Sequence, residues 1–166
     1  MTNRRAFLLS GAAVGALAAA GGLLYWRQSG DVRDASFEIS RSEDEWRAML
    51  SEDEYAVLRE EATERPFSSP LNDETRDGTF TCAGCGLDVY SSQAKFNSGT
   101  GWPSFYESLQ DAVETKADRS LLVERTEVHC RRCGGHFGHI FDDGPPPTGK
   151  RHCLNGVALD FRPRDA

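Results

Sequence analysis

Apolar and polar residues follow four successive patterns along this chain of 166 residues. An uncharged, largely apolar stretch runs from Ala6 to Trp26, and a polar, charged stretch follows it. Apolar residues then recur at helical spacing, and after Pro66 and Pro70 they come in short runs separated by Gly, Asn, Asp and Pro. The pattern predicts an N-terminal targeting segment, a linker, and a body that begins with helices and continues with strands.

The helical part carries two capping signals. Ser42 stands three residues before Glu45, and Ser51 stands three residues before Glu54. In such a capping box the serine and the glutamate satisfy backbone N–H groups at the start of a helix. We therefore expect two short helices, which pack on the core through apolar residues at helical spacing. These residues are Trp46, Met49, Leu50, Tyr55 and Leu58.

The rest of the body consists of runs rich in β-branched and aromatic residues, bounded by turn residues. None of these runs alternates with a long helix, so the pattern favours antiparallel sheets. The predicted fold class is mostly β, or α+β, with short N-terminal helices. The expected strands span residues 79–82, 87–90, 121–126, 128–130, 136–141 and 157–161.

Residues 1–30 have the character of a targeting segment rather than of part of the folded domain. Arg4 and Arg5 are followed at once by Ala, Phe and Leu, and this start resembles the twin-arginine export signal. The alanines at 18–20 offer a cleavage site, whereas residues 23–26 continue the apolar run to a length that crosses a bilayer, about 20 residues. A cleaved signal and a retained anchor both remain open.

The chain therefore divides into a signal or anchor at 1–30, a linker at 31–40 and one domain at 41–166. The signal implies export by the twin-arginine machinery to the periplasm or to the outer face of the cytoplasmic membrane. The chain has 19 basic and 26 acidic residues, and residues 1–30 hold three arginines and no acid, which leaves 16 against 26 in the body. Such an acidic body lacks the positive surface that nucleic acid requires, and we therefore expect no nucleic-acid ligand.

Five cysteines cannot all pair within one chain. Four of them form two Cys-x-x-Cys pairs, Cys82 with Cys85 and Cys130 with Cys133, and each pair is followed by glycine. Four thiolates can surround one Zn²⁺ at about 2.3 Å, and such a closed site is structural. In an exported protein, disulfides are the alternative. We favour one zinc ion, because a bond inside one Cys-x-x-Cys pair closes only a tiny loop.

Cys153 lies outside these pairs. A lone cysteine is most often a small buried apolar residue. Here, however, Arg151 brings a positive charge, which favours the nucleophilic thiolate. His136 and His139 add imidazoles that can move protons. A thiol with nearby imidazoles is a minimal apparatus for attack on an electrophile.

Five motifs follow one another along the body: TERPF at 63–67, KFNSGTGWPSF at 95–105, RTEVHC at 125–130, GHFGHIFDDGP at 135–145 and TGKRHCLN at 148–155. Together they resemble the motifs of the peptide-methionine (R)-S-oxide reductases, the B-type methionine sulfoxide reductases. The resemblance covers residues 42–162 and both Cys-x-x-Cys pairs. Several motifs in one order are more specific than any single motif.

The resemblance implies two antiparallel sheets joined by the zinc site, and an enzyme that reduces methionine-R-sulfoxide, mainly in oxidised proteins, to methionine. Cys153 would attack the sulfoxide sulfur and become a sulfenic acid. His136 and His139 would bind and protonate the oxygen. Asn155 and Asp143 match polar positions of that site, the first hydrogen-bonding near the substrate and the second supporting it.

The resemblance also implies that Trp102, with Phe105 of the same motif, binds the substrate, the indole holding the methionine methyl group. Thr100 stands where many members have a second, resolving cysteine, so the sulfenic acid would be reduced by a thioredoxin-like protein or another external thiol. His152 replaces a common aromatic residue, and Gly156 replaces a common serine.

Two other interpretations stay open beside the enzyme. A non-catalytic, zinc-containing binding module would keep Cys153 buried and unreactive. A Cys–His hydrolase would use the same thiol on an acyl group, although the chain has no motif of its own for that chemistry.

Overall fold

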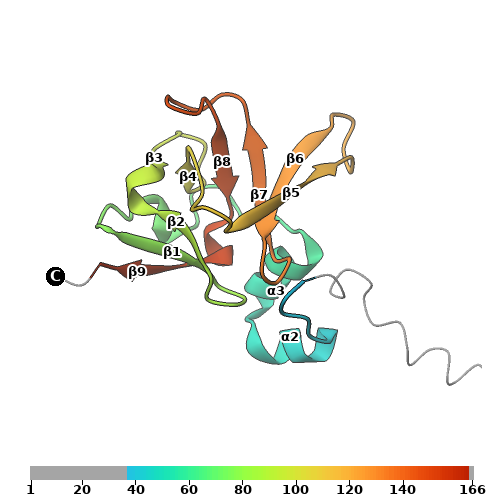
Figure 1. Cartoon of the computed structure of the whole chain (residues 1–166). Helices are drawn as coiled ribbons and strands as arrows, with labels where there is room; N and C mark the ends of the chain where they lie inside the picture. Colours follow the sequence, from blue (N-terminus) through green and yellow to red (C-terminus); the bar gives the residue numbers. More distant parts are fainter. Residues whose placement is uncertain (1–36, 165–166) are drawn as a thin grey trace, which may run out of the picture.

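The computed structural model describes residues 37–164 (Figure 1). The predicted signal or anchor at 1–30 and most of the linker at 31–40 lie outside the described residues. Between residues 37 and 164, no helix has the length and apolar character needed to span a lipid bilayer. The described part contains two antiparallel sheets and two α-helices, which confirms the predicted fold class.

The smaller sheet has three strands. Its central strand is β1 (Gly78–Cys82), with β2 (Asp88–Ser91) on one side and β9 (Leu159–Pro163) on the other. Both pairings are antiparallel, and the β1–β2 pairing shifts register between Phe80 and Thr81. The sheet therefore joins an early hairpin to the last strand of the chain.

The larger sheet has six strands in the order β3-β4-β8-β7-β6-β5, all paired antiparallel. Its central strands are β8 and β7, and β5 forms one edge, as Figure 1 shows. The strands are β3 (Lys95–Phe96), β4 (Ser104–Phe105), β5 (Val113–Asp118), β6 (Arg125–Cys130), β7 (His136–Phe141) and β8 (Arg151–Leu154).

Both predicted capping boxes are present. In α2 (Glu43–Met49), the Glu45 N–H donates to Ser42 Oγ and the Ser42 N–H donates to Glu45 Oε2. In α3 (Glu52–Glu60), Ser51 and Glu54 make the same reciprocal pair. These bonds satisfy N–H groups that a helix start otherwise leaves without partners.

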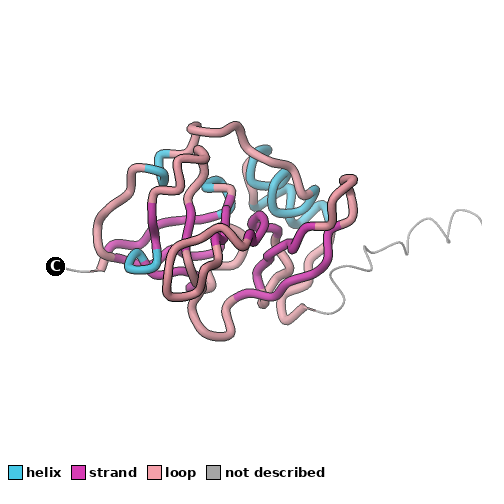
Figure 2. Tube along the Cα trace, turned by 90° about the horizontal axis from the view of Figure 1, so that it is seen from above, coloured by secondary structure: helices cyan, strands magenta, loops and turns pink. Residues whose placement is uncertain are grey.

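The two helices lie together at one side of the molecule (Figure 2). Helix α3 packs against β7 and against η4 (Gly156–Ala158), the short helical turn between β8 and β9. Trp46, Tyr55 and Leu58 are buried as expected, whereas Met49 is exposed. The helices thus cover the region where the two sheets meet.

Three of the expected strands match observed ones closely, and the mismatches have local causes. Residues 136–141 are a strand as predicted, and residues 79–82 and 87–90 shift by about a residue. Of the expected runs at 121–126 and 128–130, residues 125–130 form one strand, β6, and residues 121–123 lie in the exposed hairpin tip before it. The last strand starts later because η4 occupies residues 156–158.

Strands β3, β4, β5 and β8 are absent from the sequence prediction. The first two are only two residues long. Strand β5 is an edge strand with charged, exposed side chains, which protect sheet edges but hide the strand pattern. Strand β8 has the polar start Arg-His-Cys, and its side chains are nevertheless buried or half-buried.

Aromatic side chains fill the space between the two sheets. The Phe105 ring of β4 lies 4.9 Å from that of Phe80 in β1 and 4.6 Å from that of Tyr90 in β2, centroid to centroid. All three are fully buried. Phe105 therefore cannot touch a substrate, and its predicted substrate-binding role is wrong: the period of two along β4 puts Phe105 in the core and Ser104 on the other face.

Candidate active site and cysteine cluster

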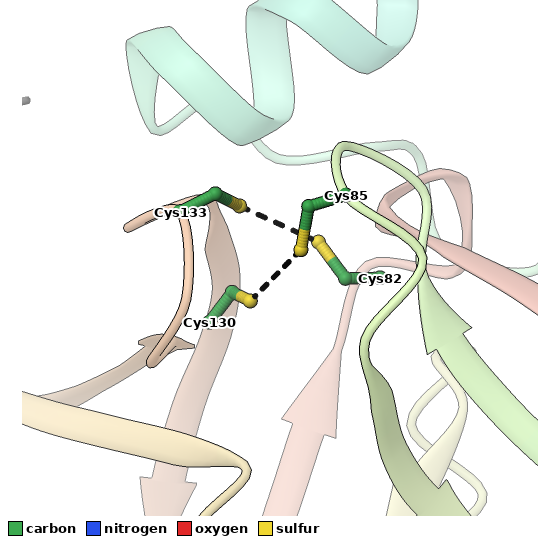
Figure 3. Close-up of side chains that lie close together, drawn as sticks. All are labelled: Cys82, Cys85, Cys130 and Cys133. Carbon is green, nitrogen blue, oxygen red and sulfur yellow. Dashed lines mark hydrogen bonds between the residues drawn. The ribbon is translucent and has the colours of Figure 1, made fainter. Parts of the chain in front are cut away.

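Four cysteines from the two sheets meet at one point (Figure 3). Cys82 ends β1 and Cys130 ends β6, while Cys85 and Cys133 lie in the turns that follow. Their sulfur atoms all lie within 4.8 Å of one another. The contacts drawn are 3.7 Å between Cys82 and Cys133 and 3.5 Å between Cys85 and Cys130, so these thiols are not disulfide-bonded.

Both turns have the same construction. The Gly86 N–H donates to the Cys82 carbonyl at 2.7 Å, and the Gly134 N–H donates to the Cys130 carbonyl at 2.8 Å. The two glycines have φ of 68° and 69°, a left-handed conformation that glycine adopts without strain. The glycine after each Cys-x-x-Cys pair therefore directs the second sulfur back toward the first.

The cluster fits a metal ion held by four sulfur atoms. Sulfurs placed about 2.3 Å from a central Zn²⁺ at the corners of a tetrahedron lie about 3.8 Å apart, close to the observed contacts. Hydrogen bonds among the thiols lower the pKa of Cys85, led by Cys130, and that of Cys130, led by Cys133, whereas contacts led by Cys130 raise the pKa of Cys82 and Cys133. Binding of a metal ion would deprotonate all four thiols, because the thiolate is the form that ligates a metal.

Cys153 lies on the larger sheet, in a row of side chains that crosses four strands. It pairs with Ser104 of β4 on one side and with His139 of β7 on the other, and His139 pairs in turn with Glu127 of β6. Directly paired residues share one face of a sheet. Cys153 is half-buried, so a ligand can reach this row of side chains at Cys153.

His139 is bound to a carboxylate. Its Nε2 lies 2.7 Å from Asp118 Oδ2, and the Arg125 guanidinium lies 2.6 Å from the same oxygen. Hydrogen bonds from Ser120 and then from His139 hold the pKa of Asp118 well below its usual range. Asp118 therefore stays ionised and fixes the imidazole opposite Cys153.

His136 is bound to a second carboxylate, in the same manner. Its Nδ1 lies 2.9 Å from Glu127 Oε1, and both side chains are buried. Burial lowers the pKa of His136 to about 4. The His136 and His139 rings meet edge to face with centroids 5.5 Å apart. The row that contains Cys153 thus includes the His139 imidazole and has the His136 imidazole beside it, each bound to its own carboxylate.

Arg151 and Asp143 form a pair next to the thiol. The guanidinium makes two parallel bonds of 2.9 Å to Asp143, and this contact raises the pKa of Arg151, with a further contribution from Cys153. The Asp143 side chain is largely exposed. Asp143 therefore acts on the site through Arg151, in line with the supporting role expected for it.

Hydroxyl groups flank Cys153 on the side of β4. Thr100 Oγ1 lies 3.8 Å from Cys153 Sγ, and the Ser98 hydroxyl lies 2.8 Å from both Thr100 Oγ1 and Ser104 Oγ. Position 100, which holds a resolving cysteine in many members of the family that the motifs resemble, is thus adjacent to the thiol. In this chain that position offers a hydroxyl only.

Trp102 is held by the loop before the smaller sheet. Its Nε1–H donates to the Glu64 carbonyl at 3.2 Å, and the Glu64 side chain accepts from the N–H groups of Gly156 at 2.6 Å and Val157 at 3.2 Å. Glu64 therefore links the tryptophan to the turn that follows β8. Trp102 is half-buried, which leaves part of the indole free to contact a ligand.

Asn155 has a different place from the one expected. Its Oδ1 accepts from the Glu64 N–H at 3.0 Å, and its Nδ2 donates to the Phe137 carbonyl at 2.9 Å. The side chain is buried. Because its amide is hydrogen-bonded to main-chain groups, Asn155 joins the loop at Glu64 to strand β7 at Phe137 and does not contact a substrate directly.

Besides Thr100, the two residues that depart from the pattern of the family that the motifs resemble have structural roles here. His152 points to the core, where its Nδ1 lies 3.0 Å from the Tyr90 hydroxyl and its ring packs on Tyr90 as an aromatic residue would. At Gly156, a Cβ atom would lie 1.9 Å from Ser69 Oγ. A serine would not fit at position 156 without a shift of Ser69.

The structure thus brings Cys153, His136 and His139 together, with Arg151 and Asp143 beside them. Sequence reasoning missed Asp118, Glu127 and Glu64 as parts of the site. One signal was available for Glu127: in strand 125–130 it alternates with Thr126, Val128 and Cys130, which predicts a polar face shared with Arg125 and His129. The alternation does not reveal which imidazole the carboxylate meets.

Comparisons with known proteins agree with the motifs. Residues 50–163 match the model of the SelR domain. The curated protein "Peptide methionine sulfoxide reductase MsrB" of Methanosarcina barkeri is 51% identical over 125 residues, which is 75% of this chain and 88% of that protein. Proteins of the same name from Leifsonia xyli and Pseudomonas putida are 47% and 50% identical, over 81% and 77% of this chain and 99% and 98% of their own lengths.

The matched residues include the cysteine cluster, the row through Cys153 and both carboxylate-bound histidines. On this domain match and on relatives that align over most of their length, the chain belongs to the SelR-domain family of MsrB peptide methionine sulfoxide reductases.

Proposed function

We propose that this chain reduces the R epimer of methionine sulfoxide, mainly within oxidised proteins, to methionine. The observation that carries the proposal is the row in which the half-buried thiol of Cys153 lies opposite His139, with His136 beside it and each imidazole bound to a carboxylate. This arrangement joins a nucleophile to groups that can deliver a proton. Family membership supplies the substrate class.

In the proposed reaction, the Cys153 sulfur attacks the sulfoxide sulfur while an imidazole protonates the sulfoxide oxygen. The S–O bond of the substrate breaks and the oxygen passes to the Cys153 sulfur, which gives methionine and a cysteine sulfenic acid. Cys153 loses two electrons and the substrate sulfur gains two. The Arg151 guanidinium stabilises the attacking thiolate by its charge.

We assign the substrate methyl group to Trp102. An indole face is a good partner for the apolar, polarisable end of a methionine side chain. The hydrogen bond to the Glu64 carbonyl fixes the ring, so its contact surface is set before the substrate arrives.

The enzyme needs an external reductant in this scheme. The chain has five cysteines, four of which are in the cluster, and Thr100 stands next to the thiol where a resolving cysteine would act. An incoming thiol attacks the sulfenic sulfur, releases water and forms a mixed disulfide, which a second thiol then resolves. A thioredoxin-like dithiol protein meets this requirement.

The four-cysteine cluster would hold one structural Zn²⁺. Four thiolates saturate the ion and leave no open position, so the ion would join the sheets without taking part in the reaction. Its ligands come from β1 and the turn after it, and from β6 and the turn after it.

The test of the proposed function is an assay of both sulfoxide epimers with dithiothreitol as reductant. The parent protein should consume the R epimer and leave the S epimer, and Cys153→Ser should consume neither. Circular dichroism and metal content of Cys153→Ser should equal those of the parent. Undiminished consumption of the R epimer by Cys153→Ser would rule out the proposed nucleophile.

For the N-terminal segment, we propose export by the twin-arginine machinery, on the basis of Arg4 and Arg5 and the apolar run behind them. Cell fractionation of a bacterial host that expresses the full chain tests this. Conversion of both arginines to lysine should keep the protein in the cytoplasm. Unchanged delivery to the periplasm or to the membrane's outer face would contradict it.

A further inference from the structure

Glu127 is a buried carboxylate whose bond to His136 has no assigned step in the proposed reaction. Only 2% of its surface is exposed, although it stands in a strand next to the sheet edge. Burying an ionised carboxylate is costly unless partners compensate for the lost water. Its contacts therefore show what the side chain is for.

The partners of Glu127 lie on two strands. Oε1 lies 2.9 Å from His136 Nδ1 of β7, and Oε2 lies 2.8 Å from Lys116 Nζ of β5. Lys116 is itself 2.7 Å from Glu61 Oε1, at the end of α3. A charged chain thus runs from helix α3 through Lys116 and Glu127 to His136.

The contact with Glu127 decides which nitrogen of His136 carries the proton. An ionised carboxylate can only accept a hydrogen bond, so Nδ1 must carry the hydrogen that it donates. The neutral imidazole then has its lone pair on Nε2. In the strand register, Glu127 of β6 is paired with His139 of β7, and His139 is paired with Cys153 of β8. The His136 imidazole that Glu127 holds therefore belongs to the face of the sheet that bears the thiol.

We propose that Glu127 is a positioning residue that holds His136 in the Nδ1–H form, so that Nε2 carries the proton from the Cys153 thiol to the sulfoxide oxygen. This inference rests on the proposed function. The step is balanced: the proton lost by the thiol ends on the oxygen, and the oxygen ends on Cys153. Glu127 supplies the negative charge that stabilises the imidazolium formed midway.

Other charged groups face His136 and set the background for this role. They come from the C-cap of α3 and from strands β5, β6 and β7, and they include both signs. Glu127 is the carboxylate that a hydrogen bond joins to the His136 ring. The other groups are Glu61, which caps α3, Lys116 and Asp118 of β5, Arg125 and His129 of β6, and His139 of β7 itself.

The first test needs no variant. In the parent protein as purified, nitrogen-15 NMR of the histidine rings at pH 7 should show His136 protonated at Nδ1 and unprotonated at Nε2. An Nε2–H form of His136 would overturn the inference. This readout does not depend on activity, and it keeps the inference falsifiable even where a variant fails to fold.

The second test is Glu127→Gln, which keeps the size of the side chain and removes its charge. A glutamine can turn its amide to donate to Nδ1, which favours the opposite tautomer. We expect kcat for the R epimer to fall about 100-fold or more, by analogy with other carboxylates that orient a histidine, with KM changed little. The pH dependence of kcat should change as well, which mere loosening of the fold would not produce.

Glu114→Gln is the matched control, because Glu114 is an exposed glutamate of β5, 3.9 Å from His129 rather than bonded to His136. It should behave as the parent does. In a His136→Asn background, Glu127→Gln should cost nothing further, because its effect passes through His136.

The outcomes separate the two claims. A parent inactive on both epimers would defeat the proposed function, whatever the tautomer of His136. A parent that needs Cys153, combined with a folded Glu127→Gln variant that keeps kcat within about threefold, would defeat only the role of Glu127. An equal loss from Glu127→Gln with and without His136 would do the same.

Discussion

At the scale of single residues, the site depends on pairings between side chains far apart in the chain. His136 meets Glu127 and His139 meets Asp118, across separations of 9 and 21 residues. The thiol and both imidazoles are chemically distinctive, so the sequence alone indicates them. Their carboxylates are found only when the strand register is known, because aspartate and glutamate are common everywhere on an acidic chain.

Phe105 shows the opposite error at the same scale. It belongs to a motif of the site, and yet its side chain lies fully in the core. Ser104, its neighbour, is the residue that pairs with Cys153. Membership of a motif does not say which of two successive residues faces the site, because side chains alternate along a strand.

The buried His152 should make the protein sensitive to acid. Burial lowers its pKa to about 4, below the ordinary value of 6.5, so the folded state resists protonation. The contribution of His152 to the unfolding free energy is therefore fully present above pH 6.5, and it is lost as the pH drops toward 4. By linkage the loss at pH 4.5 is about 2–3 kcal/mol for this residue.

His152→Phe isolates this effect. At pH 7 the variant should be slightly less stable, because the Tyr90 hydroxyl loses its partner. Between pH 7 and 4.5, however, its unfolding free energy in denaturant titrations should fall by about 2–3 kcal/mol less than that of the parent. Equal losses in the two proteins would show that His152 is not held neutral in the core.

At the scale of elements, the periodic and capped segments were predictable. Both helices begin at their capping boxes, and β7 has the predicted bounds. Strands β5 and β8 were not, because an exposed edge strand and a short polar strand lack an apolar alternation. Strand β8 lies in the middle of the sheet because it pairs with β4 and β7. Its own residues do not indicate this position.

The loop around Glu64 is the element that joins Trp102 to the turn after β8. Glu64→Ala would remove the acceptor of the Gly156 and Val157 N–H groups. We expect a loss of about 1–3 kcal/mol in unfolding free energy, since unsatisfied buried groups cost about that much. KM for the sulfoxide should rise several-fold, because the main-chain carbonyl of residue 64, which accepts from Trp102, is no longer anchored to this turn by the carboxylate.

Glu60→Ala is the control for this change. Glu60 is an exposed glutamate at the end of α3, paired with Arg47 at the surface, and exposed ion pairs contribute little. Its removal should leave both stability and KM near the parent values. If Glu64→Ala is no worse than Glu60→Ala, the loop does not depend on the Glu64 carboxylate.

At the scale of the whole molecule, the cysteine cluster lies at the junction of the two sheets. Cys82 and Cys85 belong to the smaller sheet and its turn, and Cys130 and Cys133 belong to the larger one and its turn. The two Cys-x-x-Cys pairs are enough to predict this joint from the sequence. What the sequence does not indicate is that the aromatic core between the sheets, around Phe80 and Phe105, lies under the strand pairs that carry the site.

Elemental analysis should find one zinc ion per chain, and its removal should weaken the whole fold. A chelator should lower the thermal midpoint of the full protein, and added zinc should restore it, because binding to four thiolates contributes folding free energy. Cys85→Ser should behave as the chelated parent does. A metal-free protein that unfolds at the same temperature as the parent would refute a structural ion in this cluster.

The central claim is that Cys153 takes the sulfoxide oxygen and cannot complete the cycle alone. The most direct measurement is a single turnover of the reduced protein with methionine-R-sulfoxide in the absence of any thiol, followed by methionine analysis and mass spectrometry of the peptides. The account predicts one methionine per chain and one added oxygen atom on the peptide that contains Cys153. No methionine, repeated turnover without a thiol, or an oxygen atom on another peptide would contradict it.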